Sequence, residues 1–342
     1  MIKFILGLPY VMRGPLLDTA RALKAPVLFS ANALSNWKKD ALGIPVWNGF
    51  NTKRLGLLDG MEAYLDCGGF VAARQYRGYA WSVDEYLDLC AAYPWRWVAS
   101  MDYCVEPEIA GNRETVLDRI SATVALNRAC MIGARDRGIL HRLMPVIQGW
   151  MPEDYARCLD RMPDLSSFEV IGVGSMCRRH LNGSTGILQV VEELDRHLQG
   201  SSVKLHLFGL KGIGAAELRG HPRISTVDSQ AYGTRARVLA REAGFSKTNK
   251  FLAEIMADWY QRQVAAIEQP VKTTRHPSPL LNLCPPRPDD PMEARLQQAR
   301  EQMRELLESG EIDWEQVHDG NVLAWAYDEE AEAGEPSILL AA

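Results

Sequence analysis

Eight short apolar runs, most of them followed by a segment with helical periodicity, constrain the fold of this 342-residue chain more than any other feature. Runs of this length indicate buried strands, and their alternation with helices indicates parallel pairing. The runs lie at residues 3–8, 26–31, 96–102, 142–149, 168–174 and 204–210, together with those that carry Asp66 and Asp228 at their ends. The sequence therefore predicts an α/β fold of the (β/α)8 TIM-barrel type.

Polar residues stand at the ends of several of these runs, among them Asp66, Asp102, Gln148, Gly172 and Asp228. Because a barrel of this type carries its active site at the carboxyl ends of its strands, we expect these residues to surround one site. Two carboxylates at strand ends suggest a reaction site. The alternative role of Asp66 and Asp228 is to cap the helix that follows each strand.

The chain is expected to divide into three parts. Residues 1–270 form the barrel, residues 271–291 a proline-rich linker or strap, and residues 292–342 an acidic, helical C-terminal addition. The prolines of the second part cannot sustain a helix. With 47% hydrophobic residues, the chain can bury one large core, which suits a barrel of about 250 residues with additions.

Charge is distributed unevenly along the chain, although the net charge is only -5. Residues 289–342 hold 15 acidic and 3 basic side chains, so the rest carries 35 Lys and Arg against 28 Asp and Glu. A basic barrel with an acidic appendage favours a polyanionic partner. The alternative is an ordinary mixed surface.

The cysteines indicate the compartment and argue against a metal. All seven lack CxxC or CxC spacing, which argues against a disulfide framework and a structural zinc and favours a reducing, cytoplasmic setting. The stretch FILGLPYV lacks a basic leader, so it is interpreted as the first strand and not as a signal peptide. No run approaches membrane-spanning length, and we expect no membrane partner.

Six segments resemble motifs of the tRNA-guanine transglycosylases, in the same order along the chain. They are LDCGGF, WVASMDYC, PVIQG, VIGVGS, LHLFG and TVDSQAYGTRAR, within residues 60–240. Members of that family that act on tRNA carry a zinc site after the nucleophile, whereas here only Cys284 follows Asp228 among the cysteines. The chain therefore looks closer to the DpdA branch, whose members exchange a guanine in DNA for a 7-deazaguanine such as 7-cyano-7-deazaguanine.

The resemblance implies a role for each motif. A carboxylate can stabilise or capture the cationic C1′ that forms when a base leaves its sugar, and Asp228 matches this nucleophile. Asp66 matches the acid that protonates the departing base. Asp102 and Gln148 would bind the guanine edge.

Further residues are expected around the base. Phe70 and Phe208 would stack on it, with ordinary barrel core as the alternative. Gly172 matches the first glycine of the family's pair; Val173 stands where the second is usual, unless the register shifts to Gly174. Gly209, in LHLFG, completes the expected base site. The implied partners are double-stranded DNA, a free 7-deazaguanine base and a second copy in a homodimer, with no cofactor.

Basic residues are expected to contact phosphates, the alternative for each being a solvated face. The candidates are Arg235, Arg237, Arg178, Arg179, Lys38 and Lys39. The two lysines lie in a long insert, residues 32–62, that also holds Trp37 and Trp47 and is a candidate wedge for the gap left by a flipped base.

Three other functions remain open at this point. The first is exchange on tRNA by the same chemistry. The second is a non-catalytic nucleic-acid-binding subunit on the same barrel. The third is an unrelated barrel glycosidase, which would need aromatic residues that bind sugar at the rim.

Overall fold

The computed structural model describes residues 2–75, 78–162 and 165–270 continuously, apart from a few side chains, and residues 292, 295, 296, 298, 299, 302, 303, 312 and 320–326 beyond them. Among these residues, no helix is both long enough and apolar enough to cross a membrane.

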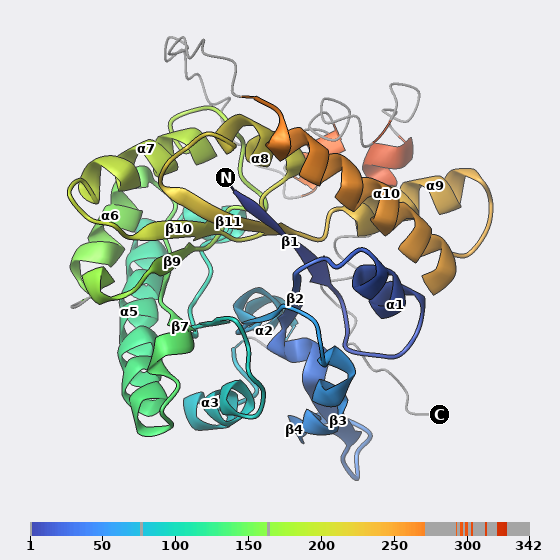
Figure 1. The fold of residues 1–342 in the computed structure, drawn as a ribbon, viewed down its shortest axis with the longest axis horizontal. Coiled ribbons are helices and arrows are strands. Elements are labelled where there is room, and N and C mark those ends of the chain that lie inside the picture. Colours follow the sequence, from blue (N-terminus) through green and yellow to red (C-terminus); the bar gives the residue numbers. More distant parts are fainter. Residues whose placement is uncertain are drawn as a thin grey trace.

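A parallel sheet of nine short strands forms the centre of the molecule (Figure 1), in the order β7-β6-β5-β2-β1-β11-β10-β9-β8. The strands are β1 (Lys3–Leu8), β2 (Val27–Ser30), β5 (Ala63–Asp66), β6 (Val98–Ala99), β7 (Leu143–Met144), β8 (Val146–Ile147), β9 (Val170–Val173), β10 (Lys204–Leu207) and β11 (Ile224–Ser229). β7 and β8 flank Pro145, which has no N–H to donate to the ladder. β7 and β8, which belong to the single segment 143–147, lie at the two ends of the sheet. The sheet therefore closes into a barrel of eight strand segments, and the predicted fold is confirmed.

Helices follow the strands and cover the outside of the barrel (Figure 1). They are α1 (Pro15–Ala22), α2 (Gly69–Gln75), α3 (Val83–Ala91), α4 (Pro107–Ala110), α5 (Arg113–Asp136), α6 (Pro152–Asp160), α7 (Ile187–His197), α8 (Gly212–Leu218), α9 (Tyr232–Glu242) and α10 (Asn249–Glu268). Short 3-10 helices are η1 (Ala31–Leu34), η2 (Thr52–Leu58), η3 (Leu140–Arg142) and η4 (Leu165–Ser167).

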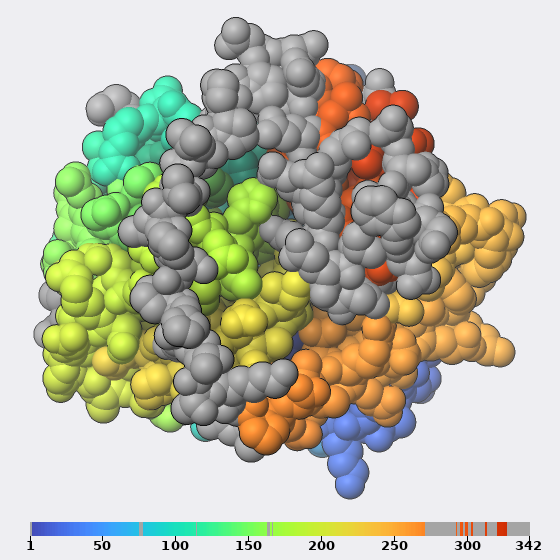
Figure 2. Space-filling model, turned by 90° about the horizontal axis from the view of Figure 1, so that it is seen from above, coloured from blue at the N-terminus to red at the C-terminus, as the bar shows by residue number. Residues whose placement is uncertain are grey.

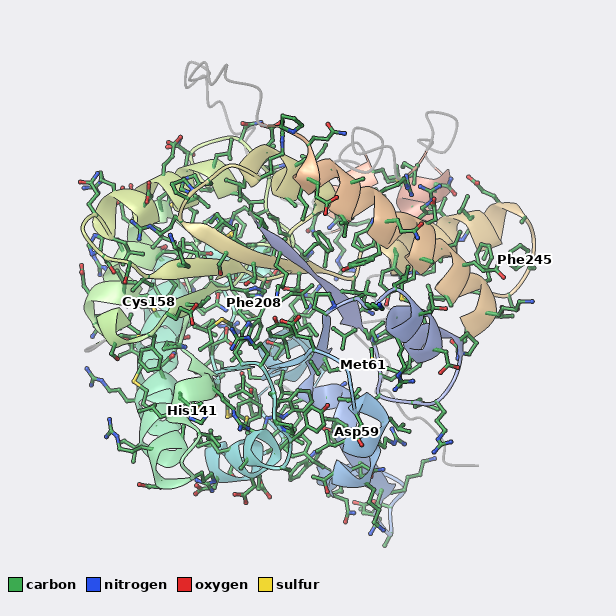
Figure 3. The ribbon with its side chains drawn as sticks, viewed as in Figure 1. Asp59, Met61, His141, Cys158, Phe208 and Phe245 are labelled. Carbon is green, nitrogen blue, oxygen red and sulfur yellow. The ribbon has the colours of Figure 1, made fainter. Side chains whose placement is uncertain are left out.

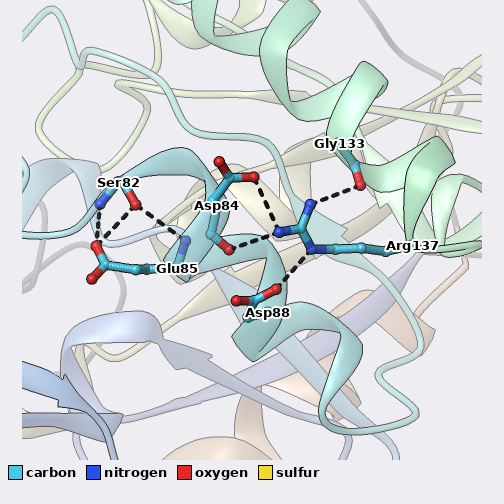
Figure 4. Close-up of polar contacts among 6 residues, drawn as sticks. All are labelled: Ser82, Asp84, Glu85, Asp88, Gly133 and Arg137. Carbon is cyan, nitrogen blue, oxygen red and sulfur yellow. Dashed lines mark hydrogen bonds and ion pairs between the residues drawn. The ribbon is translucent and has the colours of Figure 1, made fainter.

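Polar contacts fix α3 and its packing on α5 (Figure 4). Ser82 and Glu85 form a capping box at the start of α3, in which each side chain accepts a hydrogen bond from the other residue's backbone N–H. Arg137, just after α5, donates to the carboxylates of Asp84 and Asp88. These contacts fix α3 against the C-terminal end of α5 in the outer layer of the barrel.

Alternation along the strands separates the barrel interior from the helix-facing layer. Ile5, Leu28 and Tyr64 belong to an interior cluster, whereas their neighbours on each strand pack in the larger core against the helices. Successive side chains of a strand point to opposite faces. Every second residue of a strand therefore enters the barrel, and the last inward residue of each strand faces its carboxyl end.

The insert between β2 and β5 contains an antiparallel hairpin that the strand pattern did not predict. It consists of β3 (Ser35–Lys39) and β4 (Pro45–Phe50). Trp47 packs against Phe50 and Trp81 with ring centroids 5.2 and 6.1 Å apart, and its indole Nε1 donates to the hydroxyl of Ser35. The base of the hairpin is thereby fixed to the barrel.

The predicted strap, residues 271–291, lies outside the described residues. Of the C-terminal addition, residues 320–326 are helical, and Ala299, Met303, Ile312, Val322 and Ala326 form a small buried cluster. Figure 2 shows described C-terminal residues, in red, beside the orange surface of the last barrel helices.

Candidate active site

A cavity of about 790 Å³ contains most of the residues expected at the carboxyl ends of the strands. Its lining includes Asp66, Phe70, Asp102, Gln148, Gly174, Arg178, Phe208, Gly209, Asp228 and Arg237. This volume falls in the range of about 300–1,000 Å³ that small-molecule sites occupy. Residues that are far apart in sequence thus converge on one cavity large enough for a nucleobase.

Asp66 is a carboxyl group whose surroundings favour its protonated form. It ends β5, and one of its oxygens accepts a hydrogen bond of 3.0 Å from the backbone N–H of Gly68. Burial raises its pKa to about 7, and the negative charges of Asp102 and Asp228 contribute to the rise. A carboxyl group with this pKa can both give and take a proton near neutral pH.

Asp228 lies on β11, which is separated from β5 by β2 and β1, and only 10% of its side chain is exposed. Its Oδ1 accepts a hydrogen bond of 2.9 Å from the backbone N–H of Gly209. His206 Nε2 lies 3.2 Å from the same oxygen. Two nitrogen atoms therefore lie within 3.2 Å of one oxygen of this carboxylate.

Gly209 is required by its conformation and its surroundings. Its φ of +64° lies in the left-handed region, which favours glycine. A Cβ at this position would stand 2.5 Å from the Cβ of Cys177. The turn after β10 can therefore direct its N–H at Asp228 only with glycine.

Asp102 and Gln148 form the centre of a hydrogen-bonded network in the cavity wall. The Gln148 amide donates to Oδ2 of Asp102, and the thiol of Cys67 donates to Oδ1 over 3.0 Å. Ser175 donates to the Gln148 carbonyl oxygen over 2.7 Å. Burial raises the pKa of Asp102, while the hydrogen bonds from Cys67 and Gln148 oppose the rise. The network fixes the carboxylate of Asp102 beside the amide of Gln148 in the wall of the cavity.

Gly69 allows Asp102 to approach the LDCGGF turn. A Cβ on Gly69 would lie 2.6 Å from Oδ1 of Asp102 and 2.8 Å from the Tyr79 hydroxyl. Tyr79 donates to the backbone carbonyl of Asp102 over 2.7 Å and accepts from its N–H over 3.1 Å. The second glycine of the motif is thus explained by packing against the predicted base-binding aspartate.

The two phenylalanines occupy different settings in the cavity wall. Phe70 is 41% exposed, and the guanidinium of Arg74 lies 5.9 Å from its ring centroid. Phe208 is partly buried near the centre of the barrel (Figure 3) and meets His206 edge to face at 4.4 Å. Both rings line the cavity, from opposite regions of the chain.

The structure separates the two glycines of VIGVGS. Gly172 lies on β9 beneath Phe208, where a Cβ would be 2.7 Å from the ring, and it is not among the residues that line the cavity. Gly174 lines the cavity, and a Cβ there would overlap the Gln148 side chain. The shifted register, with Gly174 at the base site, suits the geometry better than Gly172.

The basic candidates differ in what they contact. Arg179 is 2% exposed and donates to the backbone carbonyls of Gly149, Trp150 and Ser175, so its burial argues against a phosphate contact. Arg178 is paired with Glu108 over 2.7 Å, with only 9% of its side chain exposed.

The remaining basic candidates are more accessible. Arg235 and Arg237 lie on α9 and are partly exposed, and Arg237 borders the cavity. Lys38 and Lys39 are exposed on β3 of the hairpin. These four remain candidates for phosphate contacts.

Several site residues were not predicted from the sequence, among them His206, Tyr79, Gln302 and Trp325. His206 could have been found by counting inward positions back from Phe208 along KLHLF, because strand alternation places both on one face. Gln302 and Trp325 line the cavity from the C-terminal addition, and the Trp325 indole donates to Gln302 over 2.5 Å. No sequence pattern indicated that contact.

Among the residues that the structure describes, no three His, Cys, Asp or Glu side chains gather in a way that could hold a metal ion. The polar groups of the cavity include carboxyl, amide and hydroxyl groups suited to hydrogen bonding and proton transfer, together with the basic side chains Arg74, Arg178, Lys211, Arg237 and Arg241.

Fold and site together define a (β/α)8-barrel protein with a cavity large enough for a nucleobase that holds two carboxyl groups in different environments. The family model of DpdA, DeoxyPurine in DNA protein A, matches residues 37–285, and the chain belongs to this family. Membership confirms the resemblance seen in the sequence and supports a DNA-guanine transglycosylase type of function with DNA as substrate. A search of curated proteins finds no match.

Replacing Asp66 by Asn is expected to make the protein less sensitive to alkaline pH. The folded-state pKa of Asp66 is about 7 against an ordinary value of 3.8, so its contribution to stability is lost as pH rises through 7. We expect the melting temperature of Asp66→Asn, relative to the unsubstituted protein, to be higher at pH 8 than at pH 5. Asp118→Asn, on the exposed surface of α5, is the control. An equal difference at both pH values would contradict this environment for Asp66.

Gly69→Ala is expected to displace Asp102 and weaken base binding, because the added methyl group would overlap the carboxylate. We expect at least about a tenfold loss of affinity for guanine in calorimetric titration, as for loss of a hydrogen bond to a charged group. Gly233→Ala, on α9 where a Cβ meets no atom within 4 Å, should bind like the unsubstituted protein. Unchanged binding by Gly69→Ala would place the base elsewhere in the cavity.

Proposed function

We propose that this protein exchanges guanine in DNA for a 7-deazaguanine, such as 7-cyano-7-deazaguanine, through a covalent intermediate on Asp228. The observation that carries the proposal is the unlike pair of carboxyl groups in one cavity. The pKa of Asp66 is raised to about 7 by burial, whereas Asp228 receives a backbone hydrogen bond from Gly209. Two carboxyl groups in different environments can perform opposite tasks.

The reaction follows from these environments. The Asp228 carboxylate attacks C1′ of the extruded nucleotide as the bond to N9 of guanine breaks, and Asp66 gives its proton to the departing base. The free 7-deazaguanine then loses its N9 proton to Asp66 and attacks C1′, which releases Asp228. The carboxylate charge and the proton both return to their starting groups, so the exchange needs no other reactant.

Base selection rests on the Asp102 and Gln148 network. A carboxylate oxygen accepts from N1–H and the 2-amino group of guanine, and the Gln148 amide donates to O6. Ser175 and Cys67 hold these two groups in place. Adenine would leave the buried acceptors unpaired and would be rejected. Phe70 and Phe208, which both line the cavity, are proposed to stack on the base.

The proposal is tested by incubating the protein with radiolabelled 7-cyano-7-deazaguanine and either duplex DNA or bulk tRNA. We expect label in DNA with the unsubstituted protein and none with Asp228→Asn, which keeps the shape of the side chain but removes the nucleophile. A denaturing gel should show a covalent protein–DNA adduct that is also lost in Asp228→Asn.

Other results would contradict the proposal. Label in tRNA alone would assign the protein to the RNA-modifying chemistry. DNA binding without any exchange, with labelled guanine as well as with the 7-deazaguanine, would favour a non-catalytic binding subunit. Cleavage of simple glycosides would favour an unrelated glycosidase.

The β3–β4 hairpin is proposed to separate the extruded nucleotide from its neighbours. It begins two residues after Ala33, which lines the cavity together with Asn32, so it starts at the rim of the site. Leu42 and Ile44 in its turn and Val46 on β4 are 83%, 54% and 49% exposed. Apolar side chains inserted between base steps are a known means of unstacking duplex DNA. Trp47, which the insert also carries, packs against Phe50 and Trp81 and does not belong to this exposed apolar set.

Serine at positions 42, 44 and 46 together is expected to lower exchange in duplex DNA by at least about tenfold while leaving exchange in single-stranded DNA unchanged, because only the duplex must be unstacked. Ile132→Ser, at a position on α5 that is 60% exposed, is the matched control for loss of surface apolar area. An equal loss on both substrates would exclude a wedge.

A further inference from the structure

His206 is a buried polar residue in an otherwise apolar part of the barrel, directly beneath the nucleophile. It is 0% exposed, and its ring lies between Trp97 and Phe208 at centroid distances of 4.8 and 4.4 Å. Both neighbours meet the imidazole edge to face, at 61° and 84°. These contacts fix the plane of the ring, so its two nitrogens have defined directions.

The two nitrogens of the ring face different partners on β11. His206 pairs with Thr226 in the parallel register of β10 and β11, and Nδ1 lies 2.8 Å from the Thr226 hydroxyl. Nε2 lies 3.2 Å from Oδ1 of Asp228. The geometry of this contact does not meet the criteria for a hydrogen bond, and Nε2 has no other hydrogen-bond partner among the described residues. Because Thr226 and Asp228 are two residues apart on one strand, both point into the barrel and frame the ring.

The Thr226 hydroxyl can donate to Nδ1 or accept from it, so the contact is compatible with both tautomers of the ring. In the tautomer in which the hydroxyl donates, the imidazole proton resides on Nε2, the nitrogen that faces Asp228. Hydrogen bonds at catalytic groups are often poorly aligned before substrate binds and tighten in the reacting complex. Nε2–H is then the second donor to Oδ1, beside the backbone N–H of Gly209 at 2.9 Å.

We propose that His206 is a positioning residue for the nucleophile: together with Gly209 it holds Oδ1 of Asp228, so that Oδ2 is the oxygen that attacks C1′. This assignment rests on the proposed base exchange. It adds His206 as the positioning residue and Oδ2 of Asp228 as the attacking atom. When Oδ2 bonds to C1′, the electron pair of the broken C1′–N9 bond leaves with the guanine, which takes a proton from Asp66. Oδ1 becomes the ester carbonyl oxygen.

The same contact acts in the second half of the exchange. As the incoming base attacks C1′, the C1′–Oδ2 bond breaks and its electron pair restores the carboxylate. Donors that already face Oδ1 stabilise this returning charge without rearrangement. His206 is therefore expected to accelerate both formation and breakdown of the covalent intermediate and to have little part in binding the base.

His206→Phe, which keeps a planar ring between Trp97 and Phe208, removes the donor. By analogy with loss of one preorganised donor, we expect kcat for exchange of labelled 7-cyano-7-deazaguanine into DNA to fall about 100-fold. KM for the base should stay within about twofold, because the donor acts on the transition state and not on base binding. His206→Gln, whose amide can donate to Oδ1, should recover at least about tenfold of the lost rate.

Thr226→Val is a second test that does not touch Asp228. Without the hydroxyl, the proton is no longer held on Nε2, and kcat should fall with an unchanged melting temperature. If His206→Phe keeps kcat within about twofold, the inference is overturned. It is equally overturned if kcat, base affinity and melting temperature fall together and Gln gives no recovery, since that pattern marks a packing role. Exchange by the unsubstituted protein, measured alongside, separates these failures from failure of the proposed function, which would overturn both.

Discussion

The alternation of side chains along parallel strands decides which groups enter the cavity, and most of the site depends on it. On β11 the inward positions carry Thr226 and Asp228, and on β10 the inward position carries His206. Since all strands of the barrel run in parallel, these inward positions meet at one end. A shift of one residue in the register of β11 would turn Asp228 toward the helices and remove its carboxylate from the cavity.

The carboxyl groups of Asp66 and Asp228 have different electrostatic surroundings. Desolvation acts on every buried carboxyl group, but its effect depends on what else is near. Asp66 has two other carboxyl groups as neighbours and favours the protonated form. Asp228 has a backbone N–H and an imidazole nitrogen at Oδ1. The environment of each aspartate therefore includes residues from other strands of the barrel as well as, for Asp66, the backbone of its own motif.

The eight-stave barrel could be predicted from the sequence, because each strand is a short apolar run bounded by polar residues or glycine. The convergence of Asp66, Asp102, Gln148 and Asp228 followed from the rule that strand ends meet at one face. The hairpin was missed because SNWKK and PVWNGF have exposed and half-buried positions without a strong apolar pattern. The burial of Arg179 could not be predicted, since it depends on the carbonyl groups of Gly149 and Trp150, about 30 residues away in sequence, and of Thr185.

Residues that follow the barrel in sequence also line the cavity. Gln302 and Trp325 follow the last barrel helix in sequence and still border the space that holds Asp66 and Asp228. A chain shortened to residue 270 would keep the strands and helices of the barrel but would lose Gln302 and Trp325 from the cavity wall. Expression of the barrel alone would therefore leave this part of the cavity open to solvent.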